Sequence, residues 1–488
     1  MEEKKTGKRQ RSRVFRFTAV AVIVMLLAGA AGILWNSGKS TMHLQEPDSR
    51  VDIKKEMGKE PSGDKTDERS DLNHKKEESG KYQTECLQNV KYPGERELMQ
   101  GKNREPDSAF LKNLKPFYQQ TMRYTLMNDK KENMAYSPIN LYLCMAMLSE
   151  MTDGQTKQQL LDALGQESLA DVRRQSQRMW NSIYSGSNLS KCILADSIWL
   201  REDIPYDKDV LKVLADYYYA SAHQGEMGTE SMDRAIQEWI NSMTGNRLKK
   251  QAERLETHED TVLMLLSTAD FYDQWADAGK FPEENTKKDV FYNADGKKVT
   301  CDFMNQVMHS HVYQEKRFSS VSLGFESGKT MNIFLPEEGV DIEDMLENDM
   351  QKILHISSDM DGEGAEFGEV TLSLPKFEIT TEKLDFIPVM KSMGIEDLFD
   401  SVKGNFRKLL GEGDNQPPVY VDKVEQATKV AVDENGCSVA SYTVVEMREG
   451  AAMVNHKKYT INCNRPFLFV INNEYDRIPI FAGVVYQM

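Results

Sequence analysis

The sequence lacks the clustered cysteines that mark zinc sites and disulfide frameworks. Its six cysteines are scattered along the chain and include no C-x-x-C pair. Basic residues are also in the minority, since 61 Lys and Arg stand against 77 Asp and Glu, for a net charge of −16. A negative field of this kind repels phosphate backbones. We therefore expect no bound metal and no nucleic acid partner.

The common enzyme motifs are missing as well. His258 and Glu259 are followed by Asp-Thr-Val, so the helical two-histidine zinc motif is incomplete, and no G-x-S-x-G nucleophile elbow occurs. No repeat of fixed period is found, which sets solenoids and propellers aside. We expect that the protein is not an enzyme. Turnover of an ester or peptide substrate by the purified protein would instead indicate a hydrolase on an unrelated fold.

The N-terminal 35 residues have the pattern of a membrane or export segment. Residues 1–16 are strongly basic and are expected to stay in the cytoplasm, whereas residues 17–35 carry no charge. As a helix, residues 17–35 would span close to the ~30 Å hydrocarbon layer, which predicts a transmembrane anchor. Ala28-Gly29-Ala30 also resembles a cleavage site, so a removed signal peptide is the alternative. Either the chain is a single-pass cell-membrane protein with its domain outside, or it is secreted.

A polar stretch, residues 36–107, separates this run from the rest of the chain. Lys, Glu, Asp, Ser, Gly and Asn dominate it, and such a composition offers little apolar area to offset the entropy lost on ordering. We predict a disordered tether there. Residues 108–488 are then predicted to form one domain.

Helical and strand patterns alternate within residues 108–488. Ser137-Pro138 precedes apolar residues at helical spacing over 139–151, and strand-like runs follow at 262–266, 331–335, 370–374 and 466–471. The pattern predicts a mixed α and β domain whose later half is rich in strands.

A series of short segments in this domain resembles, in order, the landmarks of the serpin family of protease inhibitors. The segments are 133–140, 154–165, 196–200, 236–241, 262–275, 303–306, 333–336, 374–377, 393–399, 464–469 and 480–483. The resemblance implies an α+β fold with a large central sheet, two smaller sheets, eight or nine helices and an exposed reactive loop. It also implies a monomer that needs no cofactor. The simple anchor and tether favour a bacterial source.

The mechanism that the family implies needs an insertable loop. A protease cuts the loop, and the loop then enters the central sheet as an extra strand while the protease is still attached as an acyl-enzyme. The residues that match the hinge of this loop are Glu434, Gly436, Cys437, Ser438, Val439, Ala440, Ser441 and Thr443. No proline occurs between Pro418 and Pro466, so every N–H of the loop can join a ladder.

Strand alternation assigns the loop side chains to two sides. The resemblance places Cys437, Val439, Ser441, Thr443, Val445 and Met447 on the buried side. Ser438, Ala440, Tyr442, Val444, Glu446 and Arg448 then point away from the core. Because the buried side is small, β-branched or apolar throughout, we predict that the loop can insert.

A second matching set lies where the sheet must open. The family places a polar network there, and the matching positions are Ser137, Asn140, Ser267 and Gln426. The histidine common in the family is replaced. Because amides and hydroxyls can bond to one another without ionising, we hypothesise a latch that lacks the pH response of a histidine.

The bond that a protease would cut is predicted to join Gly450 to Ala451. Counting forward from Glu434, as in inhibitory family members, gives this bond, whereas counting back from Asn464 points near Asn455. The small and medium apolar residues here suit elastase-like or subtilisin-like proteases. Arg448 suits a trypsin-like enzyme, but it comes two residues too early, so such an enzyme would cut and escape.

Together these features predict an irreversible suicide inhibitor of serine proteases. Its partners would be the target protease, held covalently, and a membrane through the N-terminal helix. The alternative is a non-inhibitory binding or surface protein with the serpin fold.

Overall fold

Nine stretches of the chain are described by the computed structural model: residues 20–28, 83–93, 105–186, 190–276, 279–359, 361–411, 418–437, 457–473 and 476–488. The predicted reactive bond, at Gly450 and Ala451, lies outside these residues. So do the hinge residues Ser438, Val439, Ala440, Ser441 and Thr443. The chain on either side of the loop is described, up to Cys437 and again from Lys457.

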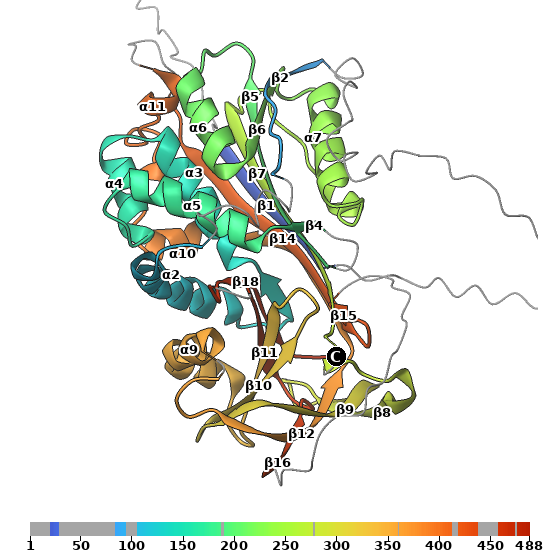
Figure 1. The fold of residues 1–488 in the computed structure, drawn as a ribbon. Coiled ribbons are helices and arrows are strands. Elements are labelled where there is room, and N and C mark those ends of the chain that lie inside the picture. Colours follow the sequence, from blue (N-terminus) through green and yellow to red (C-terminus); the bar gives the residue numbers. More distant parts are fainter. Residues whose placement is uncertain are drawn as a thin grey trace, which may run out of the picture.

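The first of two nine-stranded sheets runs through the middle of the molecule (Figure 1). Its main strand order is β1-β14-β15-β7-β5-β6-β2, with β13 paired to β14 and β4 paired to β5. β1 pairs in parallel with both β14 and β7, and the short β15 pairs antiparallel with both. The strands are β1 (Val20–Ala28), β2 (Thr84–Gln88), β4 (Ser185–Gly186), β5 (Ser190–Arg201), β6 (Ala220–Gly225), β7 (Leu263–Gln274), β13 (Phe377–Asp385), β14 (Val421–Asp433) and β15 (Gly436–Cys437).

The second sheet lies in the lower part of Figure 1 and includes β16, the strand that follows the loop. Its main order is β16-β12-β9-β10-β11-β17-β18-β3, with β8 paired to β9. The strands are β3 (Met134–Tyr136), β8 (Lys287–Tyr292), β9 (Lys298–Gln314), β10 (Phe318–Gly324), β11 (Thr330–Pro336), β12 (Glu366–Pro375), β16 (Lys457–Asn462), β17 (Phe467–Asn472) and β18 (Pro479–Val485).

Most helices cover one face of the first sheet, and α7 covers the other (Figure 1). α9 packs on the second sheet, against β11 and β17. The α-helices of the described residues are α2 (Ser108–Leu126), α3 (Pro138–Met151), α4 (Gly154–Ala163), α5 (Leu169–Ile183), α6 (Lys208–Tyr218), α7 (Glu230–Met243), α8 (Lys249–Ala252), α9 (Ile342–Ser358), α10 (Ile387–Ser392) and α11 (Arg407–Leu410). The described residues also form two 3-10 helices, η3 (Glu283–Asn285) and η4 (Asp397–Phe399).

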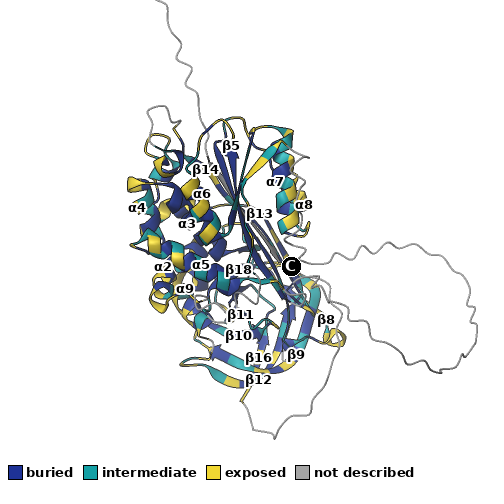
Figure 2. Ribbon diagram, turned by 45° about the horizontal axis from the view of Figure 1, so that its top comes forward, coloured by how far each residue is buried: buried dark blue, intermediate teal, exposed yellow. Residues whose placement is uncertain are grey.

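Helix α3 crosses the main core. Ser137 caps it by accepting a hydrogen bond from the Asn140 N–H at 3.4 Å, and Pro138 occupies its first turn, where a missing N–H costs nothing. All 14 residues of α3 are buried, and 11 of them are apolar, as expected for a helix that crosses a core. It packs against β18, α4, α5 and α6. The buried residues follow the central strands of the first sheet beside it (Figure 2).

A smaller apolar cluster fills the other face of the first sheet. Ile236 and Ile240 of α7 meet Met264 and Leu266 of β7 and Ala427 of β14 there. The first sheet is therefore packed on both faces.

The α+β class and the large central sheet agree with the sequence prediction. The two smaller sheets that were predicted are joined into one, because the 17-residue strand β9 pairs with β8 and β12 as well as with β10. Ten α-helices are present in the described residues rather than eight or nine, and two of them, α8 and α11, have only four residues each.

The N-terminal apolar run differs from the prediction of a membrane helix. Val20–Ala28, the middle of residues 17–35, forms strand β1 inside the first sheet. A short apolar run rich in valine and isoleucine fits a fully buried strand as well as a helix, so periodicity alone could not separate the two. No helix among the described residues has the length and apolar character needed to cross a membrane.

The predicted tether also contains structure. Within residues 36–107, β2 pairs antiparallel with β6, and the Tyr92 ring stacks on Trp180 with the ring centres 5.5 Å apart. Asp107 accepts a hydrogen bond from Arg178 at 2.5 Å. Residues 83–93 and 105–107 of the predicted tether thus contact the folded domain.

Candidate functional site: hinge, latch and strand slot

The predicted hinge begins at a carboxylate that is held in place. Glu434 forms an ion pair with Lys376 at 2.7 Å and accepts a hydrogen bond from the Thr286 hydroxyl, also at 2.7 Å. Burial raises the pKa of Glu434, but the bonds from Lys376 and Thr286 outweigh this and the pKa is lowered overall. Glu434 is therefore ionised at neutral pH and fixes the point at which the loop leaves β14.

The two hinge residues of β15 already lie in the first sheet. Gly436 and Cys437 pair with Asp433 and Val432 of β14 on one side, and with Gln274 and Asp273 of β7 on the other. Gly436 has a φ of +149°, and a Cβ there would lie 2.2 Å from the Asp273 carbonyl oxygen. Only glycine fits this close approach.

Cys437 is fully buried in the main core, as its predicted side requires. Burial raises the pKa of its thiol well above the ordinary value, and the nearby Asp273 and Asp433 raise it further. The thiol stays protonated, and we expect it to act as a small apolar side chain rather than as a nucleophile.

Continuing the β15 register gives each loop residue a neighbour on β7. Because Cys437 lies opposite Asp273 and the two strands are antiparallel, Val439 would meet Phe271, Ser441 would meet Ala269 and Thr443 would meet Ser267. Phe271, Ala269 and Ser267 are all fully buried. The register therefore supports the predicted buried side.

The other side of the inserted loop, which is predicted to point away from the core, would lie under α7 rather than in solvent. In the same register Val444 and Glu446 would meet Leu266 and Met264, which are buried under α7. The loop sequence carries no signal for this cover, because α7 comes from residues almost 200 positions before the loop. An inserted Glu446 would need α7 to move or a carboxylate to be buried.

The four predicted latch residues lie together at the N-terminus of α3. The Asn140 side chain donates to the Ser267 hydroxyl at 3.0 Å, and Ser137 donates to the Asn140 oxygen at 3.4 Å. Gln426 accepts from the Ser137 backbone N–H at 2.8 Å and donates to the Ser137 carbonyl at 3.3 Å. Each of the four side chains is at most 1% exposed. The start of α3 is thus bonded to β7 through Ser267 and to β14 through Gln426.

An ionisable group that the sequence argument overlooked lies beside this latch. Asp196 of β5 is opposite Ser267 in the strand register and is only 1% exposed. Burial raises its pKa to about 7, and the Ser267 hydroxyl opposes this rise. The latch therefore has a carboxyl neighbour that titrates near neutral pH, although its own four residues do not ionise.

A second buried carboxyl lies where the loop would enter the sheet. We call the position between β7 and β14 that an inserted loop would occupy the slot. Asp273, opposite Cys437, accepts a hydrogen bond from Ser190 at 3.0 Å and another from Ser327. Burial raises the pKa of Asp273 to about 6, and the hydrogen bonds of Ser327 and Ser190 and the charge of Lys329 partly offset the rise.

The sequence did hold signals for several of these residues. Asp196, Trp275 and Lys376 fall within segments that were matched to the family, but the match assigns them no role. Trp275 donates through its indole N–H to the Asp433 carbonyl at 2.9 Å and stacks on Phe325, so it supports the end of β14. Asp273 also lies in a matched segment without an assigned role, whereas Thr286 lies outside all of them.

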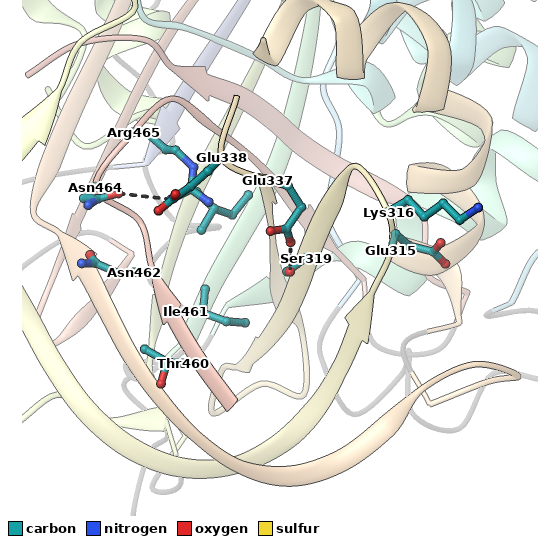
Figure 3. Close-up of a pocket in the computed structure, with 11 residues that line it drawn as sticks. Glu315, Lys316, Ser319, Glu337, Glu338, Thr460, Ile461, Asn462, Asn464 and Arg465 are labelled. Carbon is teal, nitrogen blue, oxygen red and sulfur yellow. Dashed lines mark hydrogen bonds between the residues drawn. The ribbon is translucent and has the colours of Figure 1, made fainter. Parts of the chain in front are cut away.

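A cavity of about 640 Å³ lies beside β16, the strand that follows the loop (Figure 3). Glu337 accepts a hydrogen bond from Ser319 at 2.5 Å, and Arg465 donates to Asn464 at 3.2 Å. The described residues that line it are Glu315, Lys316, Ser319, Leu335, Glu337, Glu338, Thr460, Ile461, Asn462, Asn464 and Arg465. Because this lining is mostly polar and contains no aromatic ring, the cavity differs from the apolar sites that usually bind small organic ligands.

A protein-family model described as serpin (serine protease inhibitor) matches residues 112–488, well over half of the chain. The chain belongs to the serpin family. A serpin-like protein of the archaeon Methanosarcina mazei is 24% identical over 361 residues, which cover 72% of this chain and 81% of that protein.

Solved serpin structures share the fold along nearly their whole length. The native state of tengpin, a thermophilic serpin, has a TM-score of 0.70 at 24% identity and covers 83% of this chain and 100% of its own. Human thyroxine-binding globulin has a TM-score of 0.65 at 16% identity and covers 78% of this chain and 97% of its own. These two likenesses concern the fold alone. Since serpins are protease inhibitors and not enzymes, the family assignment agrees with the expectation that this chain is not an enzyme.

Proposed function

We propose that this serpin is a one-shot covalent inhibitor of serine proteases, with elastase-like or subtilisin-like targets favoured. The observation that supports this most is β15: the hinge residues Gly436 and Cys437 pair with β14 and β7, and the continued register would send small and β-branched residues into the core. The family description supports the class of target, while the choice among serine proteases rests on the loop sequence.

The bait in this proposal is the bond between Gly450 and Ala451. The serine hydroxyl of the protease attacks the Gly450 carbonyl, the C–N bond to Ala451 breaks, and the Ala451 amine leaves with a proton. The acyl ester on Gly450 remains. Hinge residues 437–447 then insert between β7 and β14 and carry the ester away from the loop's original position before water can hydrolyse it. The serpin contributes no catalytic residue.

Residues 83–488 are the suitable material for a test, because they retain every described element except β1 and include the residues that the serpin family model matches. They would be incubated separately with pancreatic elastase, subtilisin and trypsin. We expect elastase or subtilisin to give a band that resists denaturant and has the summed mass of the two proteins. Trypsin should cut after Arg448 and form little complex.

Mass spectrometry of the released C-terminal fragment identifies the bond. A fragment that begins at Ala451 supports the forward count, and one that begins near Asn455 would support the backward count. Cleavage of the loop without any complex, for every protease tried, would contradict the inhibitory proposal and favour a non-inhibitory binding protein.

The binding alternative has one observation in its favour, which is the fold it shares with thyroxine-binding globulin. The polar lining of the cavity beside β16 weakens it, since three glutamates suit a hormone-like apolar ligand poorly. Equilibrium dialysis with apolar ligands, compared with the protease assay, separates the two functions.

We also propose that residues 17–35 export the domain, as an anchor or as a cleaved signal. The uncharged run and its basic flank support this. Intact-mass measurement on protein purified from expressing cells distinguishes the two forms, because an anchor stays with the membrane fraction and a cleaved signal leaves a shorter soluble chain. A full-length chain in the cytosol would contradict both.

A further inference from the structure

Strand β1 fills the position that the cleaved loop would need. In the continued β15 register, loop residues 439–447 would lie opposite β7 from Phe271 back to Leu263. β1 pairs with the same stretch of β7, with Ala28 opposite Phe271 and Val20 opposite Leu263. Nine residues of the N-terminal run and nine residues of the loop thus share one set of partners.

The other side of the slot shows the same overlap. β1 pairs with β14 from Val421 to Lys429, while β15 pairs with Val432 and Asp433 farther along the same strand. β1 and β15 therefore lie end to end between β7 and β14 (Figure 1). With β1 in place, the loop cannot insert beyond about residue 438.

β1 also separates the two halves of the latch. Val24 lies opposite Ser267 on β7 and opposite Gln426 on β14. Ser267 keeps its bond to Asn140, and Gln426 keeps its bond to Ser137, at the start of α3. The sheet is therefore held open by a strand that is not the loop.

The sequence of β1 is suited to this place. It reads VAVIVMLLA, with no charge, proline or glycine, and residues of this kind form strands that are buried on both faces. Its pairing is parallel, whereas an inserted loop would pair antiparallel, which is slightly more stable per residue. The backbone pairing of an inserted loop would thus be slightly more stable per residue than that of β1.

We propose that Val20–Ala28 is a removable plug: it occupies the slot between β7 and β14, and the serpin can take up its loop only after this segment has left the sheet. The inference rests on the proposed function, because it assumes that the loop must enter this slot. The same residues cannot be a strand in the sheet and a helix in a bilayer at once. Export or membrane insertion of residues 17–35 would therefore arm the inhibitor, and a chain that is not exported would stay blocked.

A loop peptide tests the plug without any protease. An acetylated peptide with the sequence of residues 439–447 would be mixed with four lipid-free proteins: the full chain, its Val24→Pro variant, its Ala31→Pro variant and residues 83–488. Proline removes a strand N–H at the centre of β1 in the first variant. In the second it falls in the same apolar run but outside β1. Native mass spectrometry and the melting temperature report one bound peptide.

We expect residues 83–488 and Val24→Pro to take up the peptide at least about tenfold faster than the full chain and Ala31→Pro, a ratio of rates that corresponds to an activation free energy lower by about 1.4 kcal/mol. Equal uptake by the full chain and residues 83–488 would overturn the plug. Failure of residues 83–488 to bind any peptide would count against the proposed function instead.

Amide hydrogen exchange tests, independently of the peptide experiment, whether residues 20–28 lie in the sheet. Residues 20–28 should exchange slowly in the lipid-free full chain and in Ala31→Pro, and fast in Val24→Pro. Exchange at the rate of an unfolded peptide in the full chain would overturn the plug whatever the loop peptide does. Adding phosphatidylcholine vesicles should raise peptide uptake by the full chain to the level of Val24→Pro, and unchanged uptake would refute release into a bilayer.

Discussion

Val439 is the first loop residue beyond β15 that would enter the main core. Its register partner, Phe271, is fully buried. A carboxylate at this position would be desolvated without a counter-ion, at a cost of several kcal/mol. We predict that Val439→Asp in residues 83–488 lowers the ratio of covalent complex to cleaved serpin at least about tenfold, measured on denaturing gels with elastase or subtilisin.

Ser438→Asp is the matched control. It adds the same charge one residue earlier, on the side that meets the half-buried Tyr272. Trapping should stay close to that of the parent protein. If Val439→Asp traps as well as Ser438→Asp, the assignment of the two sides is wrong.

The raised pKa of Asp196 predicts that the stability of the fold depends on pH through this one side chain. Its pKa is raised to about 7 from 3.8, so the neutral form stabilises the fold fully below pH 4 and this stability is lost as the pH rises through 7. Asparagine cannot ionise. The fall in melting temperature between pH 5 and pH 8 should therefore be smaller in Asp196→Asn than in the parent, by an amount worth at most about 3 kcal/mol.

Exposed Glu202, at the end of the same sheet region, supplies the control for this experiment. Glu202→Gln should leave the pH profile unchanged. Asp273, whose pKa is also raised, should keep a smaller slope of the same sign in both variants. A profile for Asp196→Asn that matches the parent would mean that Asp196 does not ionise in this range.

Among the helices and strands, helix α7 limits how far the loop can insert. It covers Met264 and Leu266, and Arg247, which follows α7, forms an ion pair with the fully buried Asp270 of β7. Because Glu446 would lie under this cover, it should slow the last part of insertion. We predict that Glu446→Ala raises the fraction of protease trapped by residues 83–488 severalfold.

Glu449→Ala removes the same charge three residues later and serves as the comparison. Position 449 lies beyond the stretch that meets Leu263, the first residue of β7, so its loss should change trapping little. A gain of equal size in both variants would point to a general charge effect on protease docking, and the role given to α7 would fail.

β1 and β2 show what element prediction from sequence missed. The run at 17–35 was predicted to be a helix, and nine of its residues form a strand, since an apolar run with no polar face carries no period to read. β2 lies in a stretch predicted to be disordered, and its pairing with β6 depends on residues more than 100 positions away. By contrast, the start of α3 was readable, because the cap Ser137 and Pro138 are local signals.

The whole molecule should gain stability once its loop is cut and inserted. Residues 83–488 clipped within the loop should melt roughly 10 °C or more above the uncut form, because a new central strand adds backbone hydrogen bonds and 1 kcal/mol raises the melting temperature of a large domain by about 2–4 °C. Calorimetry before and after brief proteolysis measures this.

The full chain gives the comparison for that measurement. With β1 in the slot, clipping should raise its melting temperature much less, and Val24→Pro should restore the larger rise. A clipped sample of residues 83–488 that melts no higher than the uncut one would rule out loop insertion.

The sequence by itself determined the family and the α+β class, and it predicts the place of the hinge and the side of each loop residue. These follow from ordered landmarks and from the alternation of a strand, both of which are properties of neighbouring residues. The four latch positions were also named from sequence, and the structure brings them together at the start of α3.

Only the tertiary structure decided which groups surround those residues. Lys376 and Thr286 hold Glu434, Asp196 lies beside Ser267, α7 covers the second face of the slot, and β1 fills it. Each of these contacts joins segments that lie far apart in the chain. Strand register and packing set such contacts, and a local pattern contains no information on which distant segment will supply the partner.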